Sequence, residues 1–126
     1  MADINQTLVK LDSFLMEKKI NYAIIGGTAA IMYGRLRATE DIDVTIMVEL
    51  EDMEKTHELI TKVYAPRLKE SKEFFQRNFV LPVIDMESNV RIDFSAGLSE
   101  FDKNAIKRRV RKKIGEIEAF ICSLRI

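Results

Sequence analysis

The sequence contains little of several residue types that mark particular classes of protein. Its 126 residues include one cysteine, one histidine and two prolines. The single Cys122 excludes an internal disulfide and a cysteine-based metal site, which favours a reducing compartment. No apolar run approaches the roughly 20 residues of a membrane span, and residues 1–5 lack the basic start of a signal peptide. We therefore expect a cytoplasmic protein that does not span a membrane.

The rest of the composition is that of an ordinary globular domain. The chain contains 20 lysines and arginines against 20 acidic residues, and 47% of its residues are hydrophobic. A chain of this length buries roughly two-thirds of its unfolded surface, which is enough for one core rather than two. We expect a single domain over residues 1–126. Its core motifs lie within residues 20–100, and a basic C-terminal segment with a possible β-hairpin covers residues 99–122.

Hydrophobic periodicity predicts a mixed α+β domain. Apolar residues recur at helical spacing in some segments, and β-branched residues form short or alternating apolar runs in others. Helices are predicted over residues 4–18, 28–33 and 50–64, a short helix or ordered loop over 99–109, and strands over 22–25, 41–47, 79–84, 90–94, 110–114 and 117–121. Pro82 lacks a backbone donor, so strand 79–84 is expected at a sheet edge. The pattern predicts a sheet with strands of both directions.

Three aspartates are the main candidates for chemistry. Asp41 and Asp43 are two apart on a predicted strand, so their side chains share one face. Asp93 has the corresponding position in the predicted strand Val90–Phe94. If the two strands are neighbours, the three carboxylates converge and repel one another unless cations bind them. Oxygen ligands suit Mg²⁺ or Mn²⁺, and two such ions can catalyse phosphoryl transfer. The alternative is that the aspartates form a solvated strand edge.

A glycine pair precedes these aspartates. Gly26, Gly27 and Thr28 lie between a predicted buried strand and a predicted helix. At such a turn a phosphate can approach backbone N–H groups at a helix N-terminus. The segment matches neither the dinucleotide-binding glycine motif nor the P-loop motif. A tight turn without a ligand is the alternative interpretation.

Taken together, these segments resemble the DNA polymerase beta-like nucleotidyltransferase superfamily over roughly residues 20–100. The similarity is closest to small prokaryotic members akin to AbiEii-type toxins and to aminoglycoside and lincosamide nucleotidyltransferases. It rests on the order strand, Gly26-Gly27-Thr28, helix, then Arg37 to Val44, then Asp93 within Val-Arg-Ile-Asp-Phe. The resemblance implies an α+β nucleotidyltransferase fold, in which helices pack mainly on one face of a mixed β-sheet.

The resemblance also implies roles for individual residues. Gly26, Gly27 and Thr28 would hold a nucleoside triphosphate, and Arg37 would contact the triphosphate or the acceptor. Asp41, Asp43 and Asp93 would be the catalytic, metal-binding carboxylates, with Asp93 helping to activate the acceptor. The implied reaction transfers a nucleoside monophosphate, foremost AMP from ATP, to an unidentified hydroxyl acceptor on a small molecule, RNA or protein. Two Mg²⁺ or Mn²⁺ ions assist, and pyrophosphate leaves.

A non-catalytic, antitoxin-like module that keeps this fold is the alternative function. Relatives usually continue into further helices, whereas this sequence ends at Ile126. Three interpretations are therefore open: a minimal member, a fragment, or one half of a site that a partner chain or a homodimer completes.

The neutral total hides two oppositely charged segments. Residues 40–58 contain eight acids and one lysine, whereas residues 103–113 contain seven lysines and arginines and no acid. The basic segment from Lys103 to Lys113 is typical of a solvated edge strand, whose charges oppose aggregation. Alternatively, it contacts RNA, DNA or another polyanion, in which case binding would weaken steeply with salt.

Overall fold

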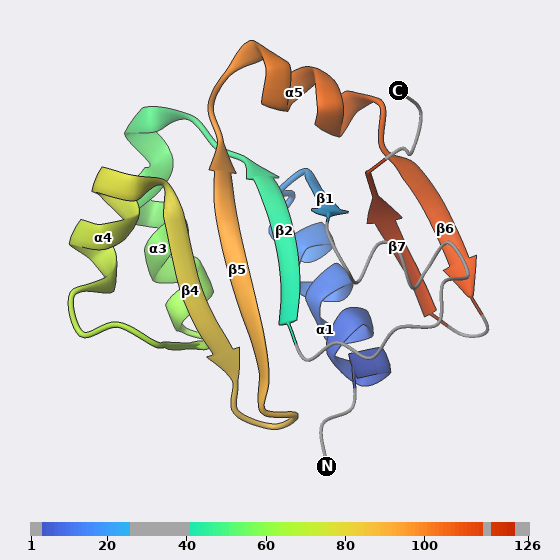
Figure 1. Cartoon of the computed structure of the whole chain (residues 1–126), viewed down its shortest axis with the longest axis horizontal. Helices are drawn as coiled ribbons and strands as arrows, with labels where there is room; N and C mark the ends of the chain where they lie inside the picture. The colour runs from blue at the N-terminus through green and yellow to red at the C-terminus, as the bar shows by residue number, and fades with distance from the viewer. Residues whose placement is uncertain (1–3, 26–40, 115–116, 123–126) are drawn as a thin grey trace.

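The computed structural model describes residues 4–25, 41–114 and 117–122, and four helices and seven strands lie within these ranges (Figure 1). The helices are α1 (Ile4–Glu17), α3 (Met53–Thr61), which follows the 3-10 turn η1 (Leu50–Asp52), α4 (Ser71–Asn78) and α5 (Glu100–Lys107). The strands are β1 (Tyr22–Ile25), β2 (Asp41–Met47), β3 (Ala65–Pro66), β4 (Val80–Asp85), β5 (Val90–Gly97), β6 (Val110–Ile114) and β7 (Ile117–Ile121). None of the described helices is long and apolar enough to cross a bilayer.

The seven strands form one mixed sheet in the order β3-β4-β5-β2-β1-β7-β6. β2 and β5 are parallel neighbours, and β1 is parallel to β7. All the other neighbours are antiparallel, including the hairpin of β6 and β7. The predicted α+β class, with strands of both directions, is therefore confirmed.

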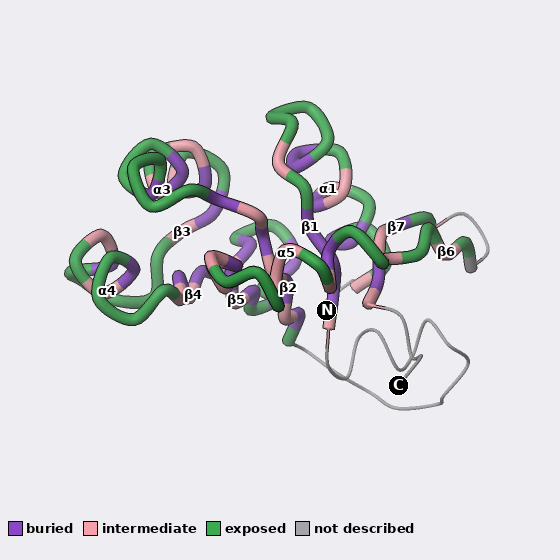
Figure 2. The backbone as a smooth tube through the Cα atoms, turned by 90° about the horizontal axis from the view of Figure 1, so that it is seen from above, coloured by how far each residue is buried: buried purple, intermediate pink, exposed green. Residues whose placement is uncertain are grey.

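Helices α1 and α3 lie together on one face of the sheet (Figure 2). We call the opposite face, which is toward the viewer in Figure 1, the front face. Helix α5 closes one end of the front face, where β2 and β5 end. A Cβ atom on Gly97 would lie 3.1 Å from the Asp102 Cβ and from the Thr45 Cγ2, so glycine allows α5 to approach the sheet closely. The expected arrangement, with helices mainly on one face, is confirmed.

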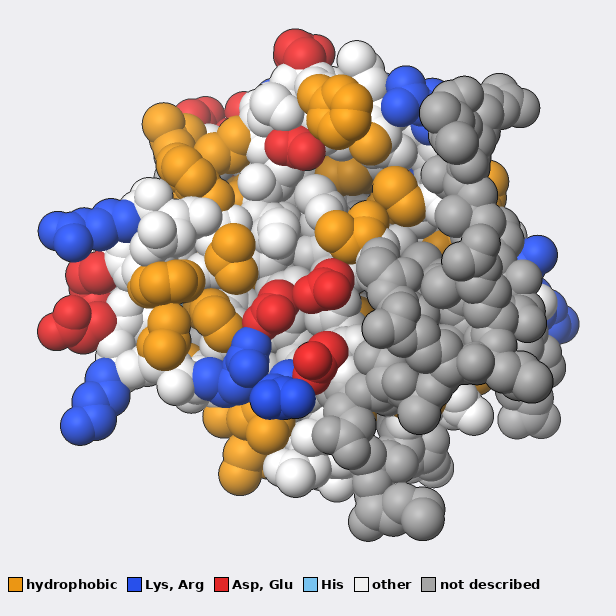
Figure 3. Space-filling model, in the orientation of Figure 1, with side chains coloured by type: hydrophobic (Ala, Val, Ile, Leu, Met, Phe, Trp, Pro, Cys, Tyr) orange, Lys and Arg blue, Asp and Glu red, His pale blue; other side chains and the backbone are white. Residues whose placement is uncertain are grey.

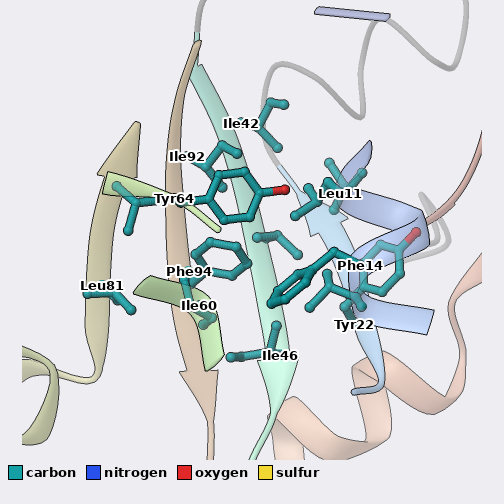
Figure 4. Packing of buried hydrophobic residues seen from close by; sticks show 14 of the residues in the cluster. Leu11, Phe14, Tyr22, Ile42, Ile46, Ile60, Tyr64, Leu81, Ile92 and Phe94 are labelled. Atoms are coloured by element: carbon teal, nitrogen blue, oxygen red, sulfur yellow. The ribbon is translucent and has the colours of Figure 1, made fainter. Parts of the chain in front are cut away.

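The core lies between the sheet and α1 and α3. Alternate residues of β2 and β5 point into it and are fully buried, including Ile42, Ile46 and Phe94. Tyr64 follows α3 and packs its ring against Phe14 of α1 and against Phe94, with ring centres 5.8 Å apart in both pairs (Figure 4). Burial of such aromatic rings contributes much of the stability of a small core.

A polar network fastens α1 to the turn between β4 and β5. Asp85 is 2% exposed, and its Oδ1 accepts a 2.7 Å hydrogen bond from the Lys10 Nζ. The Ser88 hydroxyl donates to Asp85 Oδ2 at 2.8 Å, and the Thr7 hydroxyl donates to Ser88 at 2.6 Å. Buried polar groups are costly unless they are paired, and here each has a partner.

The sequence-based expectations fail in detail after residue 61. The predicted helix over 50–64 divides into η1 and α3 and ends at Thr61, and Ala65–Pro66 form a two-residue strand that periodicity did not predict. This strand pairs with β4, so β4 is second from the edge rather than at the edge. The Pro82 carbonyl accepts a hydrogen bond from the Arg67 N–H. Because N and C=O of one strand residue point to the same side, the missing donor of Pro82 faces this short neighbour and not β5.

Candidate functional site

The three predicted aspartates lie on the front face of the two central strands. Asp43 of β2 and Asp93 of β5 are directly paired in the parallel register, and Asp41 is paired with Arg91. Neighbouring strands are about 4.8 Å apart, so the Asp43 and Asp93 side chains project side by side. The condition on which the sequence prediction depended, that the two strands are neighbours, is met.

Two arginines lie against these aspartates. The Arg67 Nη2 forms an ion pair with Asp93 Oδ1, and the Arg91 Nε lies 2.9 Å from Asp41 Oδ1. Figure 3 shows the resulting group of acidic and basic side chains near the middle of the front face. Two of the three carboxylates are thus partly neutralised by cations of the same chain.

Asp43 differs from its two neighbours. It is half-buried, and within the described part of the chain no basic side chain forms an ion pair with it. Burial raises the pKa of Asp43 above its usual value of 3.8, and the nearby charges of Asp93 and Asp41 raise it further. A carboxylate that is held beside two others without a counter-ion is electrostatically suited to bind a cation.

The donor chemistry of the three carboxylates suits a hard divalent cation. In the described ranges, however, no group of three histidine, cysteine, aspartate or glutamate side chains is placed to hold one ion. The two arginines bind oxygens of Asp93 and Asp41 that an ion would need as ligands. The aspartates therefore fit Mg²⁺ or Mn²⁺ by residue type, whereas their pairing with arginine competes with an ion.

Four other predicted site residues lie outside the described residues: Gly26, Gly27, Thr28 and Arg37. The predicted helix over residues 28–33 lies there too. Their assignment to a triphosphate stays a prediction.

Sequence reasoning missed the two arginines of the site. The position of Arg91 could have been predicted, because it lies two residues from Asp93 on the same strand and its side chain therefore shares the face of Asp93. The position of Arg67 could not, since it follows the two-residue strand β3, which exists only through its pairing with β4.

The basic segment extends from α5 into β6, the last strand of the sheet. Several of its charges have partners: Arg111 binds Asp12 through two hydrogen bonds of 2.7 and 2.8 Å and Glu118 through one of 2.9 Å, and Lys103 lies 3.2 Å from Glu49. The position of β6 agrees with the interpretation as a charged edge strand. Contact with a polyanion stays a prediction.

The described residues form a mixed sheet with aspartates on its two central strands. No protein-family model and no curated protein matches the sequence. Among solved structures, the chain is similar to a crystal structure from Thermotoga maritima described as a "putative nucleotidyltransferase (TM1012)". The TM-score is 0.67, the match covers 98% of this chain and 81% of that chain, and 12% of the residues are identical. At this identity the likeness shows the fold alone, and it confirms the expected fold.

Proposed function

We propose that the protein is a metal-dependent nucleotidyltransferase that transfers a nucleoside monophosphate, foremost AMP from ATP, to a hydroxyl acceptor. The observation that supports this most is the pairing of Asp43 with Asp93 on parallel central strands, with Asp43 lacking a counter-ion among the described residues. At this position a carboxylate does not stabilise the fold, since its charge is repelled by Asp41 and Asp93.

In the proposed reaction, an acceptor oxygen forms a bond to the α-phosphorus, and the bond from that phosphorus to pyrophosphate breaks. Bound Mg²⁺ or Mn²⁺ would neutralise charge that develops on the attacking and leaving oxygens. Asp41 and Asp43 would hold the ions, and Asp93 would accept the proton of the acceptor hydroxyl. Gly26, Gly27, Thr28 and Arg37 are proposed to hold the triphosphate.

Arg67 and Arg91 have a part in this proposal. Their ion pairs partly neutralise Asp93 and Asp41. If these carboxylates held metal ions instead, the two guanidinium groups would be free to bind phosphate oxygens, which they match in geometry.

The test compares two Asp→Asn variants in an assay of pyrophosphate release with Mg²⁺, each nucleoside triphosphate in turn, and a cell extract as the source of acceptor. Asp43→Asn should lower the rate by about a thousandfold or more, because the substitution removes a metal ligand needed in the transition state. Asp52→Asn makes the same chemical change at an exposed site in η1 and should leave the rate unchanged. Full activity of Asp43→Asn would refute the proposal.

A partner-dependent or non-catalytic module remains the second candidate. The observation that favours it is the pairing of two of the three carboxylates with arginines. Thermal unfolding with millimolar ATP and Mg²⁺ separates the two candidates. An increase in Tm that is lost in the Asp41→Asn Asp43→Asn double variant supports a nucleotide site, whereas an unchanged Tm supports the module.

A further inference from the structure

A second feature of the structure is a cavity of about 400 Å³ at the end of β2. The cavity lies between α5 and the hairpin of β6 and β7, and its lining comprises Asn21, Met47, Ile106, Lys107, Arg109 and Phe120. Met47 is on the same face of β2 as Asp43 and lies four residues further along, so Met47 is roughly 13 Å from Asp43 along the strand. A volume of this size is within the range of small-molecule sites, about 300 to 1,000 Å³.

Arg109 is an unusual cation in this cavity. Its guanidinium group lies 4.0 Å from the centre of the Phe120 ring, and its Nη2 is 3.5 Å from the Asn21 Oδ1. Among the described residues no carboxylate forms an ion pair with it. Burial lowers the pKa of Arg109, and the charge of Arg111 acts in the same direction.

Arg111 contacts the same Phe120 ring but, unlike Arg109, is paired with carboxylates. It lies 4.7 Å from the same Phe120 ring, yet it has two hydrogen bonds to Asp12 and one to Glu118. Both arginines therefore contact the Phe120 ring, but only the charge of Arg111 is neutralised by described carboxylates. Among the described residues, the half-buried charge of Arg109 thus has no acidic partner, whereas that of Arg111 has two.

The second cation of the cavity, Lys107, likewise has no carboxylate partner in the described part of the chain. A planar guanidinium group and an ammonium group together are well suited to bind phosphate oxygens. The Phe120 ring already contacts two guanidinium groups, so recognition here would rest on the phosphate rather than on stacking of a base.

We propose that this cavity binds a phosphate group of the acceptor, with Arg109 and Lys107 as its ligands. The acceptor would extend from the cavity along β2 and present its hydroxyl to Asp43 and Asp93. The acceptor role rests on the proposed nucleotidyl transfer, whereas phosphate binding itself needs neither metal nor nucleotide. The phosphate could belong to a phosphorylated sugar or to the end of a nucleic acid.

The experiment is an NMR titration of the ¹⁵N-labelled full chain in EDTA, which excludes binding through metal ions. The probes are ribose 5-phosphate and a dinucleoside monophosphate, and ribose is the uncharged control. We expect both phosphates to shift the amide signals of Lys107, Arg109 and Phe120 with saturation, and ribose to leave them in place. Tighter binding of the dinucleoside monophosphate would indicate a nucleic-acid source, and tighter binding of ribose 5-phosphate a sugar phosphate.

Matched variants test the two ligands. Arg109→Gln and Lys107→Gln should each weaken phosphate binding by about tenfold, as expected for loss of a charge-assisted hydrogen bond. Arg108→Gln removes the same charge from an exposed neighbour and should change the affinity by less than about twofold. Equal effects of Arg108→Gln and Arg109→Gln would overturn the proposal, because they would indicate attraction by net charge. Lys107 is exposed, so its variant tests the cavity even if Arg109→Gln folds poorly.

The outcome is separable from that of the pyrophosphate assay. If the protein is active but does not bind phosphate, the proposed phosphate site is refuted and the proposed function is not. Phosphate binding in a protein without transfer activity would refute the acceptor role and the proposed function, while the phosphate site itself would stand.

Discussion

Two carboxylates on opposite faces of the same sheet have opposite surroundings. Asp85 points toward the helices, is nearly inaccessible, and accepts hydrogen bonds from Lys10 and Ser88. Asp43 points to the front face, and no ion pair joins it to a described residue. Burial acts to raise the pKa of both groups, but the bonds from Lys10 and Ser88 outweigh it at Asp85, whose pKa falls below 3.8.

The comparison separates two uses of a buried charge. At Asp85 the protein supplies every partner, so the ionised carboxylate stabilises the position of α1 on the sheet. At Asp43 the neighbours are Asp41 and Asp93, so ionisation opposes folding. A group that remains unfavourable in the folded protein is more typical of a functional site than of a structural one.

The largest expected effect comes from removing the two charges in turn. Asp85→Asn should lower the free energy of unfolding by about 1–3 kcal/mol, because Lys10 and Ser88 lose their ionised acceptor. Asp43→Asn should leave that free energy unchanged or raise it, since it removes repulsion. Urea denaturation followed by circular dichroism measures both values. A loss of stability in Asp43→Asn similar to that in Asp85→Asn would contradict the claim that the Asp43 charge is unfavourable in the folded protein.

The pH dependence of these variants should differ in the same way. The lowered pKa of Asp85 means that its contribution is complete at neutral pH and is lost as the pH falls below 3.8. The raised pKa of Asp43 means that its unfavourable contribution disappears as the pH falls toward 3.8 from above. Urea unfolding at several pH values compares the free energy of unfolding of each variant with that of the wild type. As the pH falls, the difference for Asp43→Asn should shrink before the difference for Asp85→Asn. The reverse order would contradict the assigned surroundings.

A smaller effect is expected at Arg67. Arg67→Gln should tighten Mn²⁺ binding by about two- to fivefold, the size of an exposed ion pair, because the ion no longer competes with the guanidinium group for Asp93. Electron paramagnetic resonance of free Mn²⁺ measures the affinity. Lys72→Gln breaks an exposed pair with Glu54 and serves as the control. Unchanged or weaker Mn²⁺ binding in Arg67→Gln would show that Arg67 does not compete with metal.

The smallest effect concerns two buried tyrosines. The Tyr64 hydroxyl has no hydrogen-bond partner in the described ranges, so Tyr64→Phe should leave the free energy of unfolding unchanged or raise it by up to about 1 kcal/mol. The Tyr22 hydroxyl donates to Asp12 and accepts from the Phe120 N–H, so Tyr22→Phe should lower it by about 1 kcal/mol. Thermal unfolding of both variants provides the comparison. Equal losses would mean that the Tyr64 hydroxyl has a partner after all.

Local patterns in the sequence predicted most elements of the fold. Alternation in residues 41–47 and 90–94 identified β2 and β5. The turn residues Gly115-Glu116 between residues 110–114 and 117–121 indicated the hairpin of β6 and β7. The two-residue strand β3 could not be predicted, because it has no periodicity of its own and forms by pairing with β4. The insertion of β7 beside β1 likewise depends on long-range packing.

The candidate site was predictable to a different extent. Alternation alone placed Asp41 with Asp43, but the direct pairing of Asp43 with Asp93 depends on the strand register. The ion pair between Arg67 and Asp93 joins residues of different elements, so no sequence spacing indicates it. The cavity around Arg109 is also a product of tertiary structure, since its lining comes from four separate segments of the chain.

The pairing of β2 with β5 has a consequence for when the protein can act. Asp41 and Arg91 are separated by 50 positions, and so are Asp43 and Asp93. Bringing together residues so distant along the chain costs loop-closure entropy, which slows the formation of such contacts. A folding intermediate with native helices but without this pairing has no carboxylate cluster. Whatever reaction the aspartates serve, it begins only once the chain has completed its cooperative folding.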